Sequence, residues 1–189
     1  MPAISQCHIL ILATDGFEQS ELLVPLTELR QEGATVHVCA PANTKTPGAI
    51  LGWDEGDWGD PVPVDLTLDT VTAQTYDALV LPGGVMNPDT LRTDSKAIAL
   101  IKQFAEARKP IAAICHGPWL LAEAGIVKDV ELTSYNSIKT DMVNAGALWE
   151  DSDVVSDQNI ITSRNPDDLP AFVARIVMEL EASEVPAAA

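Results

Sequence analysis

The sequence predicts an α/β domain in which a mainly parallel sheet is covered by helices on both faces. Strand and helix patterns alternate along all 189 residues, which is the pattern of such a domain. The run Ile111 to Ile114 is continuously apolar, as expected for a parallel strand buried on both faces. Residues capable of chemistry follow several predicted strands, at the edge where open α/β sheets hold their functional crevice.

The first half of the chain predicts three strands and one helix around an irregular segment. Leu22, Leu26 and Leu29 share one helical face, Gly33 stops that helix, and Pro25 should kink or delay it. Gly, Pro, Asp and Trp dominate residues 43–63, so no regular element is expected there. The expected elements are a strand at 7–13, a helix at 21–32, a strand at 35–40, the irregular excursion at 43–63 and a strand at 64–68.

The second half continues the alternation. Asp94 is a suitable N-cap for a helix whose Ile98, Ile101 and Phe104 face the core. Gly125 and Gly146 each end a later helix. The expected elements are a strand at 77–81, a helix at 95–107, a strand at 111–114, a helix ending at Gly125, a strand near Leu132, a helix at 138–145, two short strands turning at 157–159, and a helix at 168–180.

Length and composition fit one folded domain. With 189 residues and 47% hydrophobic content, we expect a single domain over residues 1–182 and a frayed Ala-rich tail over 183–189. Three Cys do not make a disulfide framework and favour a reducing compartment. Residues 1–6 lack the pattern of a signal peptide, and the apolar run Ile9 to Ala13 is far too short to span a membrane. We therefore expect a cytoplasmic protein.

The charge of the chain limits its partners. A formal net charge of −17 disfavours binding to nucleic acid or to anionic membranes, because both depend on Lys and Arg neutralising phosphates. Residues 46–91 contain no Lys or Arg and eight carboxylates, most of which we expect to form a solvated face. The charge excludes partners but does not identify a substrate.

Cys115 is the candidate nucleophile. It lies where the strand at 111–114 turns into a helix beginning around Gly117 and Pro118. Backbone N–H groups and the positive end of the helix dipole stabilise an anion at such a position, so we expect a lowered cysteine pKa and a reactive thiolate. The alternative is a small, buried, inert Cys at a strand end.

The histidines limit the mechanism. The chain contains only His8, His37 and His116, and none follows Cys115 by the distance that a class I glutamine amidotransferase or an α/β-hydrolase requires. His8 and His37 lie inside strand patterns and are expected to be structural. His116 is the remaining imidazole, although its position next to Cys115 predicts that its ring points away from the sulfur's attack path.

Glu18 is the predicted proton carrier, because it follows the first strand and should reach the same crevice. A carboxyl group beside a thiolate and shielded from water has a raised pKa and can exchange protons with substrate. The alternative for Glu18 is a first-turn residue that favours the helix dipole. Gly83 and Gly84, after the third apolar strand, permit close backbone approach and complete the predicted crevice.

No metal or cofactor is expected. Cys7, Cys39 and Cys115 lie in separate segments without the short spacings of zinc sites. The sequence also lacks a GxGxxG or P-loop pattern, so we expect no nucleotide cofactor.

At four places the sequence resembles the PfpI branch of the DJ-1 superfamily. The matching segments are Asp15-Gly16-Phe17-Glu18, residues 78–84 (ALVLPGG), residues 113–118 (AICHGP) and residues 162–172 (TSRNPDDLPAF). Together they span almost the whole chain, and the glycine loop and the elbow stand in the order and spacing of that family. The resemblance implies a flavodoxin-like three-layer sandwich with a nucleophile elbow at Cys115, and a homodimer or dimer-built hexamer.

The resemblance also implies site residues beyond those argued above. Cys115 would be partnered by Glu18 and His116, and Asp89 is similar to the acid that a neighbouring subunit supplies in peptidase-like members. Asp is one methylene shorter than the Glu usual there. Trp119 stands where the family often has Gln, and we expect it to alter the wall of the substrate pocket. Trp53 and Trp58 could line an entrance, an interface or simply a packed loop.

Three functions fit these residues. The leading hypothesis is an enzyme of glyoxalase III or deglycase type, in which Cys115 attacks small reactive carbonyls or glycated adducts, Glu18 moves protons, and the backbone amides of Gly84 and His116 stabilise an oxyanion. The alternatives are a cysteine peptidase using His116 and a partner's Asp89, and a non-enzymatic sensor in which Cys115 is oxidised.

Overall fold

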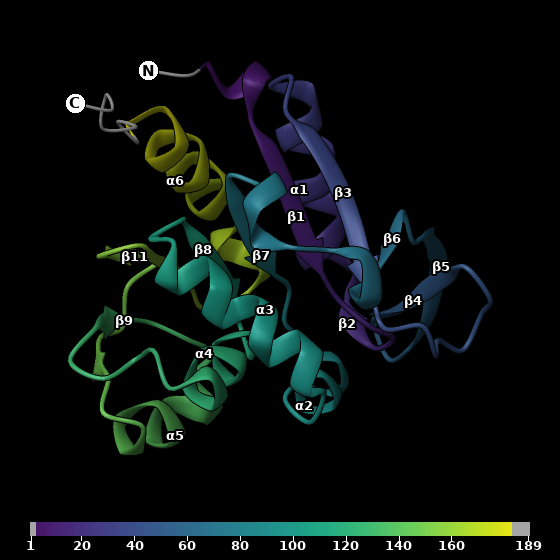
Figure 1. The fold of residues 1–189 in the computed structure, drawn as a ribbon. Helices are drawn as coiled ribbons and strands as arrows, with labels where there is room; N and C mark the ends of the chain where they lie inside the picture. Colours follow the sequence, from purple (N-terminus) through teal and green to yellow (C-terminus); the bar gives the residue numbers. More distant parts are fainter. Residues whose placement is uncertain (1–2, 183–189) are drawn as a thin grey trace.

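A seven-stranded sheet forms the centre of the computed structural model, which describes residues 3–182 (Figure 1). All neighbouring strands are parallel except β11 and β12, which form an antiparallel pair at one edge. The predicted α/β class with a mainly parallel sheet is confirmed. In spatial order the strands are β11 (Val154–Asp157), β12 (Ile160–Ser163), β8 (Ile111–Ile114), β7 (Ala78–Leu81), β1 (His8–Leu12), β3 (Thr35–Ala40) and β6 (Leu66–Thr67).

Helices cover both faces of this sheet and divide the core into two layers. Ile9 and Ile11 of β1 pack in the layer that contains buried residues of α1 (Gln19–Gln31) and α6 (Leu169–Ala182). Leu10 and Leu12 pack in the layer of α3 (Ser95–Glu106) and α4 (Pro118–Ala124). Successive strand side chains point to opposite faces, so a strand between two helix layers must be apolar at every position.

Smaller elements complete the fold. The segment after α4 contains a two-stranded parallel pair, β9 (Glu131–Leu132) and β10 (Leu148–Trp149), with α5 (Lys139–Asn144) between them. The turn predicted at 157–159 joins β11 to β12, as expected. The 3₁₀ turns are Ile4–Gln6, Leu68–Thr70, Ala73–Thr75, Asn136–Ile138 and Pro166–Asp168.

The segment predicted to be irregular, residues 43–63, is largely regular. It contains an antiparallel hairpin of β4 (Ala49–Asp54) and β5 (Asp57–Pro63), and β4 also pairs with β2 (Phe17–Glu18). Figure 1 shows the hairpin beside β2. The sequence prediction was wrong because most of β5 is exposed, so the hairpin lacks the apolar alternation that marks a half-buried strand.

Two helices also differ from expectation. α1 begins at Gln19 rather than at residue 21 and continues through Pro25 to Gln31. α2 (Met86–Leu91) was not predicted, because it is short and contains Pro88. The predicted frayed tail at 183–189 lies outside the described residues. Within residues 3–182, no helix combines the length and apolar character needed to cross a membrane.

Candidate active site

The turn from β8 into α4 places Cys115 at the floor of a cavity. Cys115 has a φ of 63°, a left-handed conformation that is uncommon for a residue with a side chain. Its backbone N–H donates to the carbonyl of Ser163 at 3.0 Å, and its carbonyl accepts from the N–H of Tyr135 at 2.8 Å. These bonds from two neighbouring segments hold the strained residue in place, which is how such strain persists at functional sites.

Glu21, rather than the predicted Glu18, carries the carboxyl group that lies against the Cys115 thiol. Glu21 is in the first turn of α1 and its side chain is fully buried. Its Oε2 accepts a hydrogen bond from the N–H of Gly83 at 2.9 Å, whereas Oε1 has no hydrogen-bond partner among the described residues. One oxygen is therefore held by the glycine loop, whereas the other is buried without a hydrogen bond among the described residues.

The sequence carries a signal for Glu21 in its helical spacing rather than in a motif. Glu21 is in line with Pro25 and Leu29 at helical spacing, and all three are buried on the face of α1 that packs on the sheet. A carboxyl group on the apolar face of a helix needs either a partner or a function, because burying its charge is expensive. Glu18 lacks this position, since it immediately precedes the helix.

Burial sets the protonation of the Cys115 and Glu21 pair. Burial raises the pKa of Glu21 to about 8, although contact with Cys115 and the N–H of Gly83 act in the opposite direction. Burial, followed by the charge of Glu21, also raises the pKa of Cys115, contrary to the lowering predicted from the helix dipole. The N–H groups of Gly84 and His116 counter this rise in part. Two adjacent acids cannot both ionise readily, so the pair titrates as a unit and retains a proton near neutral pH.

The glycine loop after β7 fits closely against this pair. A Cβ on Gly83 would lie 2.7 Å from both the Cys115 Cβ and the Glu21 Oε2, so a larger residue would displace the pair. Asn87, which the sequence analysis did not single out, is fully buried and holds the loop. Its Nδ2 donates to the carbonyl of Pro82 at 2.8 Å and to that of Gly83 at 3.2 Å, while its Oδ1 accepts from the N–H of Thr14 at 2.8 Å.

The ring of His116 contacts the sulfur, although the sequence predicted that it points away. Its Nδ1 lies 3.2 Å from the Cys115 Sγ, and its Nε2 lies 3.1 Å from the hydroxyl of Ser137. Burial lowers the pKa of His116, which favours the neutral imidazole. Tyr135 stacks on the ring with centroids 4.8 Å apart. His116 is therefore held in a fixed orientation beside the thiol.

A cavity of about 610 Å³ opens over these groups. Glu18, Glu21, Cys115 and His116 all line it, so Glu18 does reach the predicted crevice, but as part of its wall. Burial, with Asp54 as a second cause, raises the pKa of Glu18. The other lining residues are Gly16, Trp53, Gly84, Val85, Met86, Tyr135, Ser137 and Pro166.

Asp89 and Trp119 do not belong to the cavity lining of this chain. Asp89 is an exposed residue of α2, and its assignment as a partner-subunit acid stays a prediction. Trp119 lies behind His116, with ring centroids 5.2 Å apart, and its Nε1 donates to Asp141 at 2.8 Å. Trp119 therefore contacts a cavity residue, His116, without lining the cavity itself, and its expected effect on the pocket wall stays a prediction.

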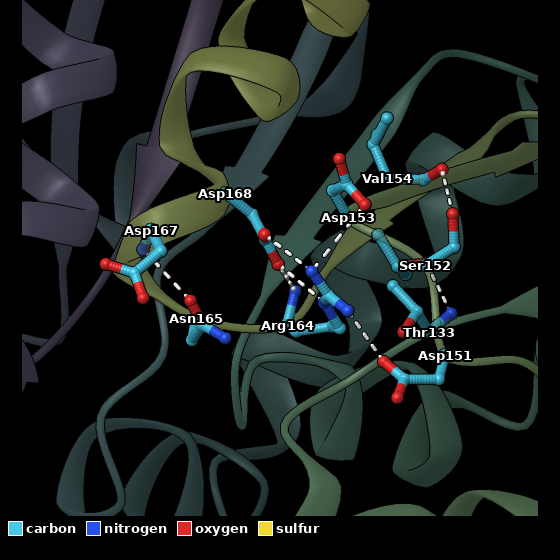
Figure 2. Close-up of polar contacts among 10 residues, drawn as sticks. Thr133, Asp151, Ser152, Asp153, Val154, Arg164, Asn165, Asp167 and Asp168 are labelled. Atoms are coloured by element: carbon cyan, nitrogen blue, oxygen red, sulfur yellow. Dashed lines mark hydrogen bonds and ion pairs between the residues drawn. The ribbon is translucent and has the colours of Figure 1, made fainter.

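An ion-pair cluster around Arg164 fixes the segment that carries Pro166 to the cavity (Figure 2). The Arg164 Nε and Nη2 each donate to one carboxylate oxygen of Asp168 at 2.9 Å, a two-point contact of defined geometry. Nη1 donates to Asp151 at 2.7 Å, and Asp153 lies 3.6 Å from Nη2. Asp168 is almost fully buried, so Arg164 compensates a charge that would otherwise be costly.

Comparison with known proteins identifies the family of this chain. The model described as the DJ-1/PfpI family matches residues 7–179. The protein named Deglycase PfpI from Pyrococcus furiosus is 40% identical over 173 residues, which cover 92% of this chain and 99% of that protein. Protein/nucleic acid deglycase 2 from Escherichia coli is 41% identical over 165 residues, covering 87% and 92%.

Solved structures agree with the observed fold. The crystal structure of Drosophila melanogaster DJ-1beta has a TM-score of 0.83 and 30% identity, and the match covers 94% of this chain and 91% of that one. Because the match covers 94% of this chain, the two proteins share the same overall fold.

Proposed function

Because the chain belongs to the DJ-1/PfpI family and holds a buried carboxyl group against a cavity-floor thiol, we propose that it acts on reactive carbonyls or on the adducts they form. Relatives named as deglycases support the class of activity. The single observation that carries the proposal is the contact between Glu21 and Cys115. A carboxyl group whose pKa is raised to about 8 can both give and take a proton near neutral pH.

With methylglyoxal as substrate, the steps balance without an external oxidant. The sulfur adds to the aldehyde carbon, and the former carbonyl oxygen takes a proton to give a hemithioacetal. Glu21 removes the proton from that carbon, and a proton returns to the neighbouring carbon, which turns the ketone into an alcohol and the hemithioacetal into a thioester. Water then cleaves the carbon–sulfur bond and releases lactate and the thiol.

Each group in the site has a role in these reaction steps. The N–H groups of Gly84 and His116, which lie at the sulfur, stabilise negative charge there and on the adjacent oxygen. The N–H of Gly83 fixes one oxygen of Glu21, which holds the carboxyl group beside the sulfur to which the substrate carbon would be bound. For an adduct on an amine, the same attack at carbon expels the amine as the leaving group and restores it.

The test compares Cys115→Ser and Glu21→Gln with wild type in lactate formation from methylglyoxal. Cys115→Ser should abolish turnover, and Glu21→Gln should lower kcat by about 10²- to 10⁴-fold, the usual contribution of a positioned acid or base. Cys7→Ala is the matched control, since Cys7 is a buried thiol outside the cavity. Wild-type lactate formation no faster than that of Cys115→Ser would refute the proposal.

A cysteine peptidase is a second candidate, and the 3.2 Å contact between the Cys115 sulfur and the His116 ring favours it. In that reaction, neutral His116 would take the thiol proton and the sulfur would form a thioester with the peptide. The acid partner would be Asp89 of a neighbouring subunit. Peptide hydrolysis that is lost in both His116→Ala and Asp89→Asn would support it, and hydrolysis unchanged by either substitution would exclude it.

A further inference from the structure

We propose that Glu18, Trp53 and Tyr135 form a cation-selective wall of the cavity, so that the site accepts positively charged adducts, such as those on guanidinium or ammonium groups, and rejects anionic carbonyl compounds. The inference rests on the proposed function and specifies its substrate class. It also gives Glu18 a role, since Glu21 occupies the position against the sulfur.

The ionisable groups that line the cavity favour a cationic substrate. Of the described residues that line it, none is Lys or Arg, and two, Glu18 and Glu21, carry carboxyl groups. Near neutral pH, Glu21 retains its proton because its pKa is raised to about 8, and burial keeps His116 neutral. Glu18, which is only partly buried, is therefore the carboxyl group of the wall that can present a negative charge to a substrate, although burial and Asp54 raise its pKa.

The backbone places Glu18 and Trp53 together. They are paired in the parallel register of β2 and β4, so both side chains leave the same face of that small sheet. The N–H of Glu18 donates to the carbonyl of Gly83 at 3.4 Å, which ties this wall to the glycine loop beside Cys115. Charge repulsion from Glu18 also contributes to the raised pKa of Glu21 at the floor of the cavity.

Two cations whose contacts adjoin cavity residues, Lys45 and Arg164, are engaged elsewhere. The ammonium of Lys45 lies 4.4 Å from the centroid of Trp58, and Trp58 in turn packs edge-on against Trp53. Arg164 is bound by three aspartates. Neither side chain lines the cavity, so neither neutralises Glu18 from within it.

Aromatic rings and a carboxylate are the groups that recognise organic cations. Trp53 and Tyr135 both line the cavity, and Tyr135 is 42% exposed. A cation is attracted to such rings, more strongly where water is excluded. A phosphate or carboxylate on the substrate would meet Glu18 with no compensating cation, and the apolar Val85 and Met86 at the same cavity reduce screening.

The first experiment measures charge selection at the sulfur without turnover. Cys115 is treated with two methanethiosulfonates of similar size, one bearing a trimethylammonium group and one a sulfonate, and modification is followed by peptide mass mapping. Each rate is divided by that for free 2-mercaptoethanol. The cationic reagent should be favoured about tenfold in wild type, the size expected for one poorly screened charge nearby.

Substitutions then identify the source of the selectivity. Glu18→Gln should bring the normalised ratio close to one, and Glu18→Lys should invert it. Glu32→Gln, an exposed carboxyl at the far end of α1, is the control for net charge and should leave the wild-type ratio in place. A wild-type ratio of one, or an equal ratio in wild type and Glu18→Gln, would overturn the proposal.

A second experiment applies the same comparison to turnover. Two peptides carry the same methylglyoxal-modified arginine, flanked by lysines in one and by aspartates in the other. The lysine-flanked peptide should have a kcat/KM about tenfold higher, and Glu18→Gln should narrow that gap, whereas Glu32→Gln should not. Equal kcat/KM values for the two peptides in wild type would refute the proposal of a cation-selective wall. Absence of turnover with either peptide would count against the proposed function instead, because the reagent ratio measures the wall independently.

Discussion

At the scale of single residues, the site depends on which of two nearby carboxyl groups is buried. Glu18 and Glu21 are three positions apart, yet Glu21 is fully buried against Cys115 and Glu18 lies half-buried in the cavity wall. The helix start at Gln19 decides this, since it turns the third residue of the first helical turn toward the sheet. The two residues consequently differ in the chemistry they can perform.

Glu21→Gln should change how stability depends on pH. The pKa of Glu21 is raised from 4.5 to about 8 by folding, so between these values the folded chain holds a proton that the unfolded chain has lost. The stabilising contribution of the Glu21 proton to the free energy of unfolding is complete below about pH 4.5 and is lost as pH rises to about 8. In this window the wild type should lose up to about 1.4 kcal/mol per pH unit relative to Glu21→Gln, an upper bound because Cys115 titrates with it.

Urea unfolding at pH 5, 6, 7 and 8 measures this difference directly. Glu28→Gln, an exposed carboxyl of the same helix, is the matched control and should preserve the wild-type pH dependence. A free-energy difference between wild type and Glu21→Gln that stays constant across these pH values would contradict the raised pKa.

At the scale of elements, Gln19 connects the β4–β5 hairpin to the first turn of α1. Its Nε2 donates to Asp54 at 2.9 Å, and its Oε1 accepts from the N–H of Asp60 at 3.2 Å. Its side chain lies so close to Gly59 that a Cβ there would be 1.7 Å from the Gln19 Oε1. Gln19 therefore holds both strands of the hairpin, and with them the cavity residue Trp53.

Gln19→Ala should loosen the hairpin while leaving the central sheet intact. Two hydrogen bonds to partly exposed groups are lost, each worth about 0.5–1.5 kcal/mol, so local opening should become roughly tenfold more frequent. Amide hydrogen exchange at residues 49–63 is the measurement, with Gln31→Ala at the exposed end of α1 as control. Exchange that accelerates equally in β1 and β7 would indicate a global effect and would rule out a local clamp.

At the scale of the whole molecule, the charge of −17 is distributed over a fold with few cations. Like charges repel more strongly in the compact chain than in the expanded one, so the net charge destabilises folding. Several ion pairs, such as those of Arg164, are partly exposed and offset the repulsion between like charges only locally.

Added salt should therefore stabilise the protein. Screening shortens the range of repulsion from about 30 Å at 0.01 M to about 8 Å at 0.15 M, so the Tm should rise over this interval of NaCl concentration. Calorimetry at pH 7 measures it, and the same ionic strength supplied by a different monovalent salt controls for ion-specific effects. A Tm that falls as NaCl increases would mean that attractive ion pairs outweigh the net repulsion.

The local pattern of the sequence determined the layered α/β fold and the position of Cys115. Strand ends are marked by local patterns, such as the apolar run Ile111 to Ile114 and the glycine and proline that follow it. Such patterns involve only a few neighbouring residues, so they predict structure without knowledge of tertiary contacts. The β4–β5 hairpin could not be predicted from the sequence, because its pairing depends on backbone hydrogen bonds and on Gln19 rather than on an apolar face.

Only the tertiary structure decided how the Cys115 thiol is tuned. The sequence placed a thiol at the start of a helix and predicted a lowered pKa, but folding buries it beside Glu21 and raises that pKa. Folding also brings the His116 ring into contact with the sulfur and places Glu18 in the cavity wall. Protonation depends on burial and on neighbouring charge, and both arise from contacts between segments far apart in the chain.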